Sequence, residues 1–178
     1  MFGYNPAKLV CLDKSGVNTD MTRRYAYSLG GSRAVDSAPL SKPKNTTILS
    51  SIQLDGTLRY TTFSGGTTVE RFKRYLETDL LPHLNGNSVL IMDNMKSHHA
   101  KAVRNLLDSS GVRYIYLPPY SPDLNPIEKL WSKVKAFLRK FKARTLDALP
   151  NAIQCAFQTV SPSDCSGWFH SCGYSPYF

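Results

Sequence analysis

The sequence has few cysteines and no long apolar run. Its four cysteines, at positions 11, 155, 165 and 172, form no CxxC pair, and this excludes the usual spacing of a zinc knuckle. The longest aliphatic run is Val89–Met92, far short of the roughly 20 residues that a membrane-spanning helix needs. The first ten residues also lack the basic start and apolar stretch of a signal peptide. We therefore expect a protein of a reducing cytoplasm, with free thiols and no membrane partner.

Two familiar catalytic patterns are absent as well. The glycine pairs Gly30-Gly31 and Gly65-Gly66 lack the strand-to-helix context of a phosphate-binding loop. The four histidines and four cysteines form no Ser/His/Asp or Cys/His arrangement that would activate a nucleophile. The sequence therefore predicts neither a nucleotide-binding loop nor an enzyme that uses a side-chain nucleophile.

Acidic residues are scarce relative to basic ones. The chain has 13 acids against 22 lysines and arginines, with a net charge of +9 and a pI near 9.5. Seven of the basic residues lie between Lys129 and Arg144, a stretch without any acid. Clustered positive charge favours nucleic acid as the partner, although a solvated helix face is the alternative. The predicted DNA contacts are Arg23, Arg24, Lys96, Lys133, Arg139 and Lys140.

The hydrophobic pattern predicts five strands and four helices in a single domain, residues 1–178. Strands are expected at 8–13, 46–54, 58–63, 88–93 and 112–117. Helices are expected at 67–81, from about Ala100 to Gly111, at 126–141 and at 146–160. Residues 14–43 show no periodicity, and an aromatic tail from Ser161 onward is expected to be loose.

The order of these elements predicts a mixed sheet. Asp55-Gly56 between two β-branched runs is typical of a hairpin, and the strand–helix alternation that follows is typical of parallel strands. We therefore expect an α/β fold in which an antiparallel hairpin joins parallel strands, with helices on both faces. In open sheets of this kind, ligands bind at the carboxyl ends of the strands.

Three acids lie where that rule places a site. Asp13 and Asp93 each follow an apolar run, Glu128 falls in the first turn of a predicted helix, and 34 residues separate Asp93 from Glu128. Three carboxylates in this arrangement can hold two divalent cations about 3.5–4 Å apart, a geometry that suits in-line attack on a phosphodiester. Either Asp alone could simply start a turn. Two of them on neighbouring strands need a cation or a shared proton.

Glu128 has a competing structural interpretation. In the phrase Asn125-Pro126-Ile127-Glu128, Asn125 suits the N-cap, Pro126 the first helical position and Glu128 the third, which is a capping-box pattern. That pattern accounts for the Glu without a metal. It does not account for the rigid PPYSPDLNP approach, which fixes where the helix starts and so suits a metal ligand.

Two longer phrases resemble a known family. LIMDNMKSHHA and YLPPYSPDLNPIEKLWSKVKAFLRK are similar to the catalytic half of transposases of the mariner superfamily, in its bacterial insertion-sequence branch. The spacing of 34 residues between the second and third acids matches that branch, and the resemblance covers roughly residues 8–175. It implies a ribonuclease-H-like fold and a DDE endonuclease that cuts transposon ends and joins the 3′-hydroxyl to target DNA, typically at a TA step.

The resemblance also implies a cofactor, site residues and partners. Asp13, Asp93 and Glu128 would be both the catalytic residues and the ligands of two Mg²⁺ or Mn²⁺ ions, while Asn94 and His98 would line the site. From its position alone, His98 could instead be a surface group in a first helical turn. DNA is the expected partner, and a homodimer and a separate helix-turn-helix chain are left open. The expected location is the bacterial cytoplasm, at the nucleoid.

Two departures from the family pattern matter. The family commonly has Glu after the first Asp, whereas this chain has Lys14. A cation there could weaken metal binding, or it could point away from the acids and contact DNA. The helix-turn-helix region with which relatives read transposon ends is not found in these 178 residues. We therefore expect weak DNA binding with little sequence preference.

Three hypotheses follow from this sequence. The chain is an active DNA strand transferase, another ribonuclease-H-like nuclease or resolvase, or a basic DNA-binding remnant without turnover. The PPYSPDLNPIE phrase favours the first over the second. Retention of all three acids argues against the third, whereas Lys14 and the missing helix-turn-helix region argue for it.

Overall fold

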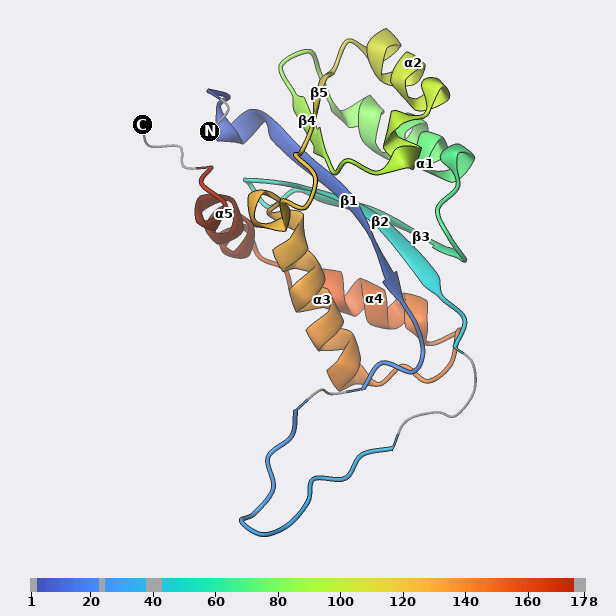
Figure 1. The fold of residues 1–178 in the computed structure, drawn as a ribbon, viewed down its shortest axis with the longest axis vertical. Coiled ribbons are helices and arrows are strands. Elements are labelled where there is room, and N and C mark those ends of the chain that lie inside the picture. The colour runs from blue at the N-terminus through green and yellow to red at the C-terminus, as the bar shows by residue number, and fades with distance from the viewer. Residues whose placement is uncertain (1–2, 23–24, 38–42, 175–178) are drawn as a thin grey trace.

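A five-stranded mixed sheet forms the centre of the protein (Figure 1). The computed structural model describes residues 3–22, 25–37 and 43–174. The strand order is β3-β2-β1-β4-β5, antiparallel through the first three strands and parallel from β1 to β5. The strands are β1 (Leu9–Val17), β2 (Thr46–Gln53), β3 (Leu58–Ser64), β4 (Val89–Met92) and β5 (Arg113–Tyr116). The predicted union of an antiparallel hairpin with parallel strands is confirmed.

Helices cover both faces of this sheet, as expected (Figure 1). One face carries α1 (Val69–Tyr75), the π-helical turn η2 (Leu76–Leu80) and α2 (Lys101–Ser110); the other carries α3 (Ile127–Phe141), α4 (Leu149–Gln158) and α5 (Pro162–Ser171). Side chains alternate along a strand, so Leu9 and Cys11 pack in the core under α3 and α4. Val10 and Leu12 pack under α1 and α2.

Short helical turns connect these elements. They are η1 (Pro6–Lys8), η3 (Leu81–His83), η4 (Lys96–His99) and η5 (Pro122–Leu124). The helix predicted at 67–81 begins with Thr68 as its N-cap, whose hydroxyl accepts from the Arg71 N–H, and ends by passing through η2 into η3. Gly111 ends α2 with φ of 73°, as its position predicted.

Strand β1 is longer than expected. It was predicted to end at Asp13 but continues to Val17, because the antiparallel partner β2 supplies hydrogen-bonding positions as far as the pair Val17–Thr46. The parallel ladder with β4, in contrast, stops at the pair Leu12–Met92. One side of β1 therefore lacks β4 as a partner from Asp13 onward.

The carboxyl-terminal region is more helical than expected. The helix predicted to begin at residue 146 begins at Leu149, and the tail predicted to be loose contains α5. A capping box starts α5: the Ser161 hydroxyl accepts from the Asp164 N–H, and the Asp164 carboxylate accepts from the Ser161 N–H. Beyond α5, the buried Tyr174 hydroxyl donates to the Leu124 carbonyl at 2.8 Å, so this region braces the loop before α3.

A long connection between β1 and β2 projects from the domain (Figure 1). Its described residues contain no helix or strand, as the missing periodicity predicted. Tyr25 and Tyr27 on it are fully exposed. Lys142 at the end of α3 binds Asp36 at 2.6 Å, which ties this segment to the helices. None of the helices in the described ranges has the length and apolar character needed to cross a bilayer.

The hairpin turn at Gly56 gives a stability prediction. Gly56 has φ of +92°, and a Cβ there would lie 2.8 Å from the Pro162 Cα at the start of α5. Gly56→Ala should therefore lower the free energy of unfolding by about 1–3 kcal/mol through strain and displacement of α5. Gly86→Ala is the matched control, since a Cβ there meets nothing within 4 Å. Urea unfolding measures both, and equal stability of the two variants would contradict the packing described here.

Candidate active site

Parallel pairing of β1 with β4 places the first two acids side by side. Leu12 and Met92 form the last pair of that ladder, and Asp13 and Asp93 follow them directly. The predicted adjacency of these two acids is therefore confirmed. Asp13 belongs to the same face as Leu9 and Cys11, and its side chain is buried toward α3. Asp93 is half-buried, at the point where the chain leaves β4.

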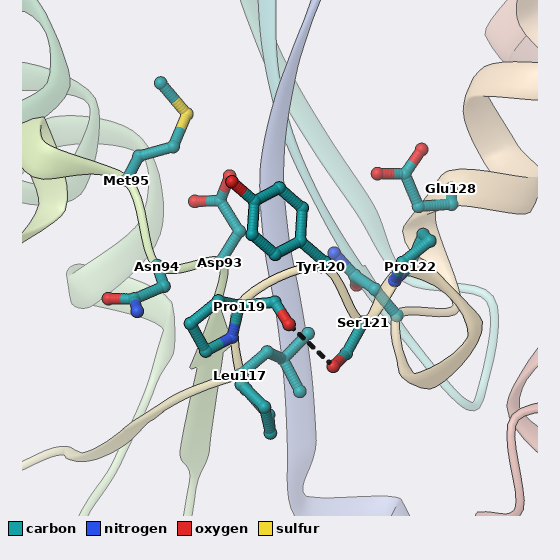
Figure 2. Close-up of a pocket in the computed structure, with 11 residues that line it drawn as sticks. Asp93, Asn94, Met95, Leu117, Pro119, Tyr120, Ser121, Pro122 and Glu128 are labelled. Atoms are coloured by element: carbon teal, nitrogen blue, oxygen red, sulfur yellow. Dashed lines mark hydrogen bonds between the residues drawn. The ribbon is translucent and has the colours of Figure 1, made fainter.

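Glu128 lies on the first turn of α3, across a cavity from Asp93 (Figure 2). Asp93 and Glu128 line one cavity of about 390 Å³ together with Asn94 and the PPYS segment (Figure 2). The proposed capping box is wrong, because Pro126 occupies the N-cap position and no side chain caps this helix. The Asn125 side-chain oxygen is buried without a hydrogen-bond partner among the described residues. The Glu128 carboxylate is consequently free of a helix-capping role.

Burial dominates the electrostatics of Asp13. The side chain is 6% exposed, and loss of solvent raises its pKa from 3.8 to about 7. The backbone N–H of Lys14 opposes this rise by donating to the carboxylate, and the indole N–H of Trp131 opposes it by donating to Oδ2 at 3.0 Å. The negative charges of Asp93 and Glu128 add to the rise in the pKa of Asp13.

The three carboxylates act on one another as like charges. Partial desolvation raises the pKa of Glu128; Lys135 opposes that rise and Asp93 adds to it. The pKa of Asp13 thus responds to both other acids, and that of Glu128 to Asp93. No three acid, cysteine or histidine side chains in the described ranges lie close enough together to hold an ion as they are placed. Repulsion between uncompensated carboxylates favours such a separated arrangement.

His98 lies directly against Asp93. Its Nδ1 is 2.6 Å from the Asp93 carboxylate and 3.2 Å from the Asp93 carbonyl oxygen. The imidazole is fully buried and stacks on Phe72, with ring centroids 4.3 Å apart. The alternative that His98 is a surface group is therefore wrong, and its ring lies against the Asp93 carboxylate. Asn94 lines the cavity and contacts the His99 imidazole; the role predicted for both residues in catalysis stays a prediction.

Trp131 is a site residue that the sequence analysis assigned only to the core. It lies three residues after Glu128 and thus on the same side of α3, where its indole N–H reaches Asp13. Its burial is nearly complete, at 4% exposure. A buried indole N–H requires a hydrogen-bond acceptor. The prediction that Trp131 lies in the core could therefore have indicated a polar partner for it.

Tyr120 is the second residue that the sequence analysis missed. It has φ of 56°, a left-handed conformation that is uncommon outside glycine, and its side chain is fully exposed. The ring lies across the cavity in Figure 2, at the tip of the Pro119–Ser121 turn. Strained backbone of this kind clusters at functional sites, and here it presents an aromatic face beside Asp93 and Glu128.

The predicted DNA contacts within the described ranges lie on two elements, η4 and α3. Lys96 is exposed on η4, three residues after Asp93. Lys133 forms an ion pair with Asp164 at 2.5 Å, which joins α3 to α5. Arg139 and Lys140 lie in the last turn of α3, roughly 16–18 Å from Glu128 along the helix axis. Arg23 and Arg24 lie outside the described residues.

Lys14 points away from the acids. Alternation along β1 places it on the face of α1 and α2, opposite Asp13. Its side chain lines a different cavity, next to Thr67. The sequence left two possibilities for Lys14, weakened metal binding or a contact with DNA. The orientation of Lys14 away from Asp13 argues against the first.

Comparison with protein families separates the first two hypotheses. The model for the DDE superfamily endonuclease matches residues 8–150, which is most of the chain. The chain belongs to this family. Over 97 residues it is 29% identical to the Tc1 transposase of Caenorhabditis elegans, covering 52% of this chain and 36% of that protein. The family favours the transposase hypothesis over an unrelated ribonuclease-H-like nuclease.

Solved structures confirm the ribonuclease-H-like fold. The chain resembles a pre-cleavage Mos1 transpososome, with a TM-score of 0.79, 19% identity, and coverage of 93% of this chain and 53% of that one. It also resembles the Mos1 catalytic domain solved with Raltegravir and Mg, with a TM-score of 0.64, 17% identity, and coverage of 92% and 77%. The chain spans about half or less of the full-length relatives.

Burial of Asp13 gives a prediction on pH. Because the pKa of Asp13 is about 7 in the folded protein and 3.8 for an ordinary Asp, the folded state binds this proton more tightly than the unfolded state does. Metal-free stability should therefore fall as the pH rises from about 4 to 7. Asp13→Asn removes the buried charge and should stabilise the metal-free protein at pH 8, by at most about 4 kcal/mol, with little gain near pH 4.

Urea unfolding in EDTA across that pH range measures the effect. Asp147→Asn is the control, since Asp147 is exposed in the turn before α4. Parallel curves for wild type and Asp13→Asn would contradict the buried-charge assignment.

Proposed function

We propose that this chain is the catalytic domain of a DNA transposase that cuts transposon ends and joins the 3′-hydroxyl to target DNA. The observation that carries the proposal is that β1–β4 pairing sets Asp13 beside Asp93 while Glu128 lines the same cavity as Asp93, in a member of the DDE family. Solved relatives described as transposon-end and strand-transfer complexes support DNA as the substrate.

The donor set fits Mg²⁺ or Mn²⁺. Both ions prefer oxygen ligands, and the three mutually repelling carboxylates would be stabilised by positive charge. Asp13, Asp93 and Glu128 would hold two such ions. A Mos1 complex described as solved with Mn supports this choice of metal. When bound, the ions would polarise the phosphodiester and stabilise the attacking and leaving oxygens.

The surrounding residues have distinct parts in this proposal. Trp131 donates to one oxygen of Asp13 and would set the direction in which that carboxylate faces the ions. The His98 ring lies against the Asp93 carboxylate and would limit its rotation, and the fixed start of α3 would position Glu128. Tyr120 offers a ring on which a base at the cut site can stack. The predicted basic residues, including those outside the described ranges, would contact phosphates.

Further parts of the proposal concern context. We infer membership of the bacterial insertion-sequence branch and a location at the nucleoid, where the DNA substrate lies. A homodimer and a helix-turn-helix segment or chain that reads transposon ends would complete the function. The spacing of 34 residues supports the branch, and the half-length coverage of the relatives is compatible with a separate DNA-reading element.

The proposal is tested by DNA cleavage. Supercoiled plasmid and a labelled duplex are incubated with the protein in Mn²⁺, in Mg²⁺ and in EDTA. Metal-dependent nicking by wild type should fall by at least about 100-fold in Asp93→Asn, since one ligand carboxylate is lost. Wild-type protein that binds DNA but never nicks it would leave the remnant hypothesis standing instead.

Metal binding should be visible without turnover. Mn²⁺ should raise the thermal midpoint of the wild type, because an ion that binds only the folded state stabilises it by an amount that grows with the logarithm of its concentration above the dissociation constant. Asp93→Asn should lose that rise. An equal rise in both proteins would mean that the ions bind elsewhere, and circular dichroism at 222 nm is the measurement.

A further inference from the structure

A second cavity lies on the opposite face of the sheet, next to the catalytic strand. It has a volume of about 300 Å³ and lies between the end of β1, the start of β2 and the turn from β3 to α1. Its lining includes Lys14, Asn18, Asn45 and the segment Gly65–Thr67, and no acidic residue is among the described residues that line it. The cavity therefore has one cation and several neutral polar groups.

Lys14 supplies an uncompensated positive charge. The side chain is half-buried, and within the described ranges it forms no ion pair. Asp13, its neighbour in the strand, is turned to the other face and bonded to Trp131. A partly desolvated ammonium without a carboxylate is favourable where an anion binds beside it.

Thr67 supplies a hydroxyl that lacks a partner. Its Oγ1 is buried, and no described residue forms a hydrogen bond with it. The neighbouring Thr47 hydroxyl, in contrast, donates to the Gly65 carbonyl at 2.6 Å. A buried hydroxyl left unpaired costs about 1–3 kcal/mol, and a ligand in the cavity that accepts a hydrogen bond from Thr67 would remove that cost.

The backbone around these groups is open to a ligand. A Cβ added at Gly16 or Gly66 would meet nothing within 4 Å. Gly65 has φ of +80°, a conformation that glycine adopts without strain. Glycines at such a turn let a ligand approach the main chain closely, next to the ammonium and the hydroxyl.

We propose that this cavity binds a phosphate group of the DNA backbone through Lys14 and Thr67. The inference rests on the proposed function, because the acids of the cutting site begin one residue away, at Asp13. β4 pairs with β1 only as far as Leu12. From Asp13 to Val17, β4 therefore does not cover this edge of β1, which lies between the two faces of the sheet. The cavity would hold DNA that continues from the cut site around this edge.

The test is duplex binding at several salt concentrations in EDTA, where no cleavage occurs. Lys14→Met should weaken binding about tenfold, the loss of one charge-assisted contact. It should also reduce the slope of log affinity against log salt by about 0.9, the value for one phosphate. Lys8→Met is the matched control, an exposed lysine at the other end of β1, and should change neither quantity.

Thr67→Val separates ligand binding from a structural role. Because the hydroxyl has no partner in the protein, its removal should leave the thermal midpoint unchanged or higher while DNA affinity falls and the salt slope stays the same. A lower midpoint with unchanged affinity would overturn the assignment of Thr67 to the ligand.

The remaining outcomes are separable from those of the cleavage test. Wild-type nicking together with equal DNA affinity of Lys14→Met and Lys8→Met would overturn the phosphate site and leave the proposed function intact. Inorganic phosphate that stabilises wild type but not Lys14→Met, without an effect of Lys14→Met on DNA, would assign the cavity to a free anion. Wild-type protein that binds no duplex would overturn both proposals.

Discussion

The burial of the Asp13 carboxylate is the constraint on which the site depends. A carboxylate within the sheet's core face is costly unless it is hydrogen-bonded or neutralised, and here it receives the Trp131 indole N–H and the Lys14 backbone N–H. The Trp131 bond adds a polar contact to the apolar side of α3 that packs against the sheet. Since Glu128 lies on the same side of α3, this bond links the helix that carries one acid to the strand that carries another.

The loop before α3 completes this arrangement from the other end. The last residue before that loop, Leu117, donates its N–H to the Met92 carbonyl at 2.8 Å, beside Asp93. Tyr174, beyond α5, donates to the Leu124 carbonyl. The start of α3 is therefore tied to β4 and to the carboxyl-terminal helix. The left-handed Tyr120 lies between these two ties, where the surrounding contacts can maintain its strain.

Sequence patterns predicted the acids better than the groups that hold them. The apolar runs before Asp13 and Asp93 were sufficient to predict that the two acids are neighbours, because the carboxyl ends of parallel strands lie at the same edge of a sheet. The extension of β1 to Val17 was not predictable from Lys14–Val17, since its cause is pairing with a strand some thirty residues later. The Trp131 bond was missed for the same reason: it joins residues 118 apart in sequence.

Capping patterns show why local rules alone were insufficient. Asn125 to Glu128 and Ser161 to Asp164 both fit a capping box, yet only the second forms one among the described residues. At the first, the helix begins at the proline and the Glu side chain faces the cavity. Tertiary context decides which use of the pattern prevails. The Glu128 carboxylate does not cap its helix, and the negative charge of Asp93 repels it. Positive charge that enters the cavity would relieve this repulsion.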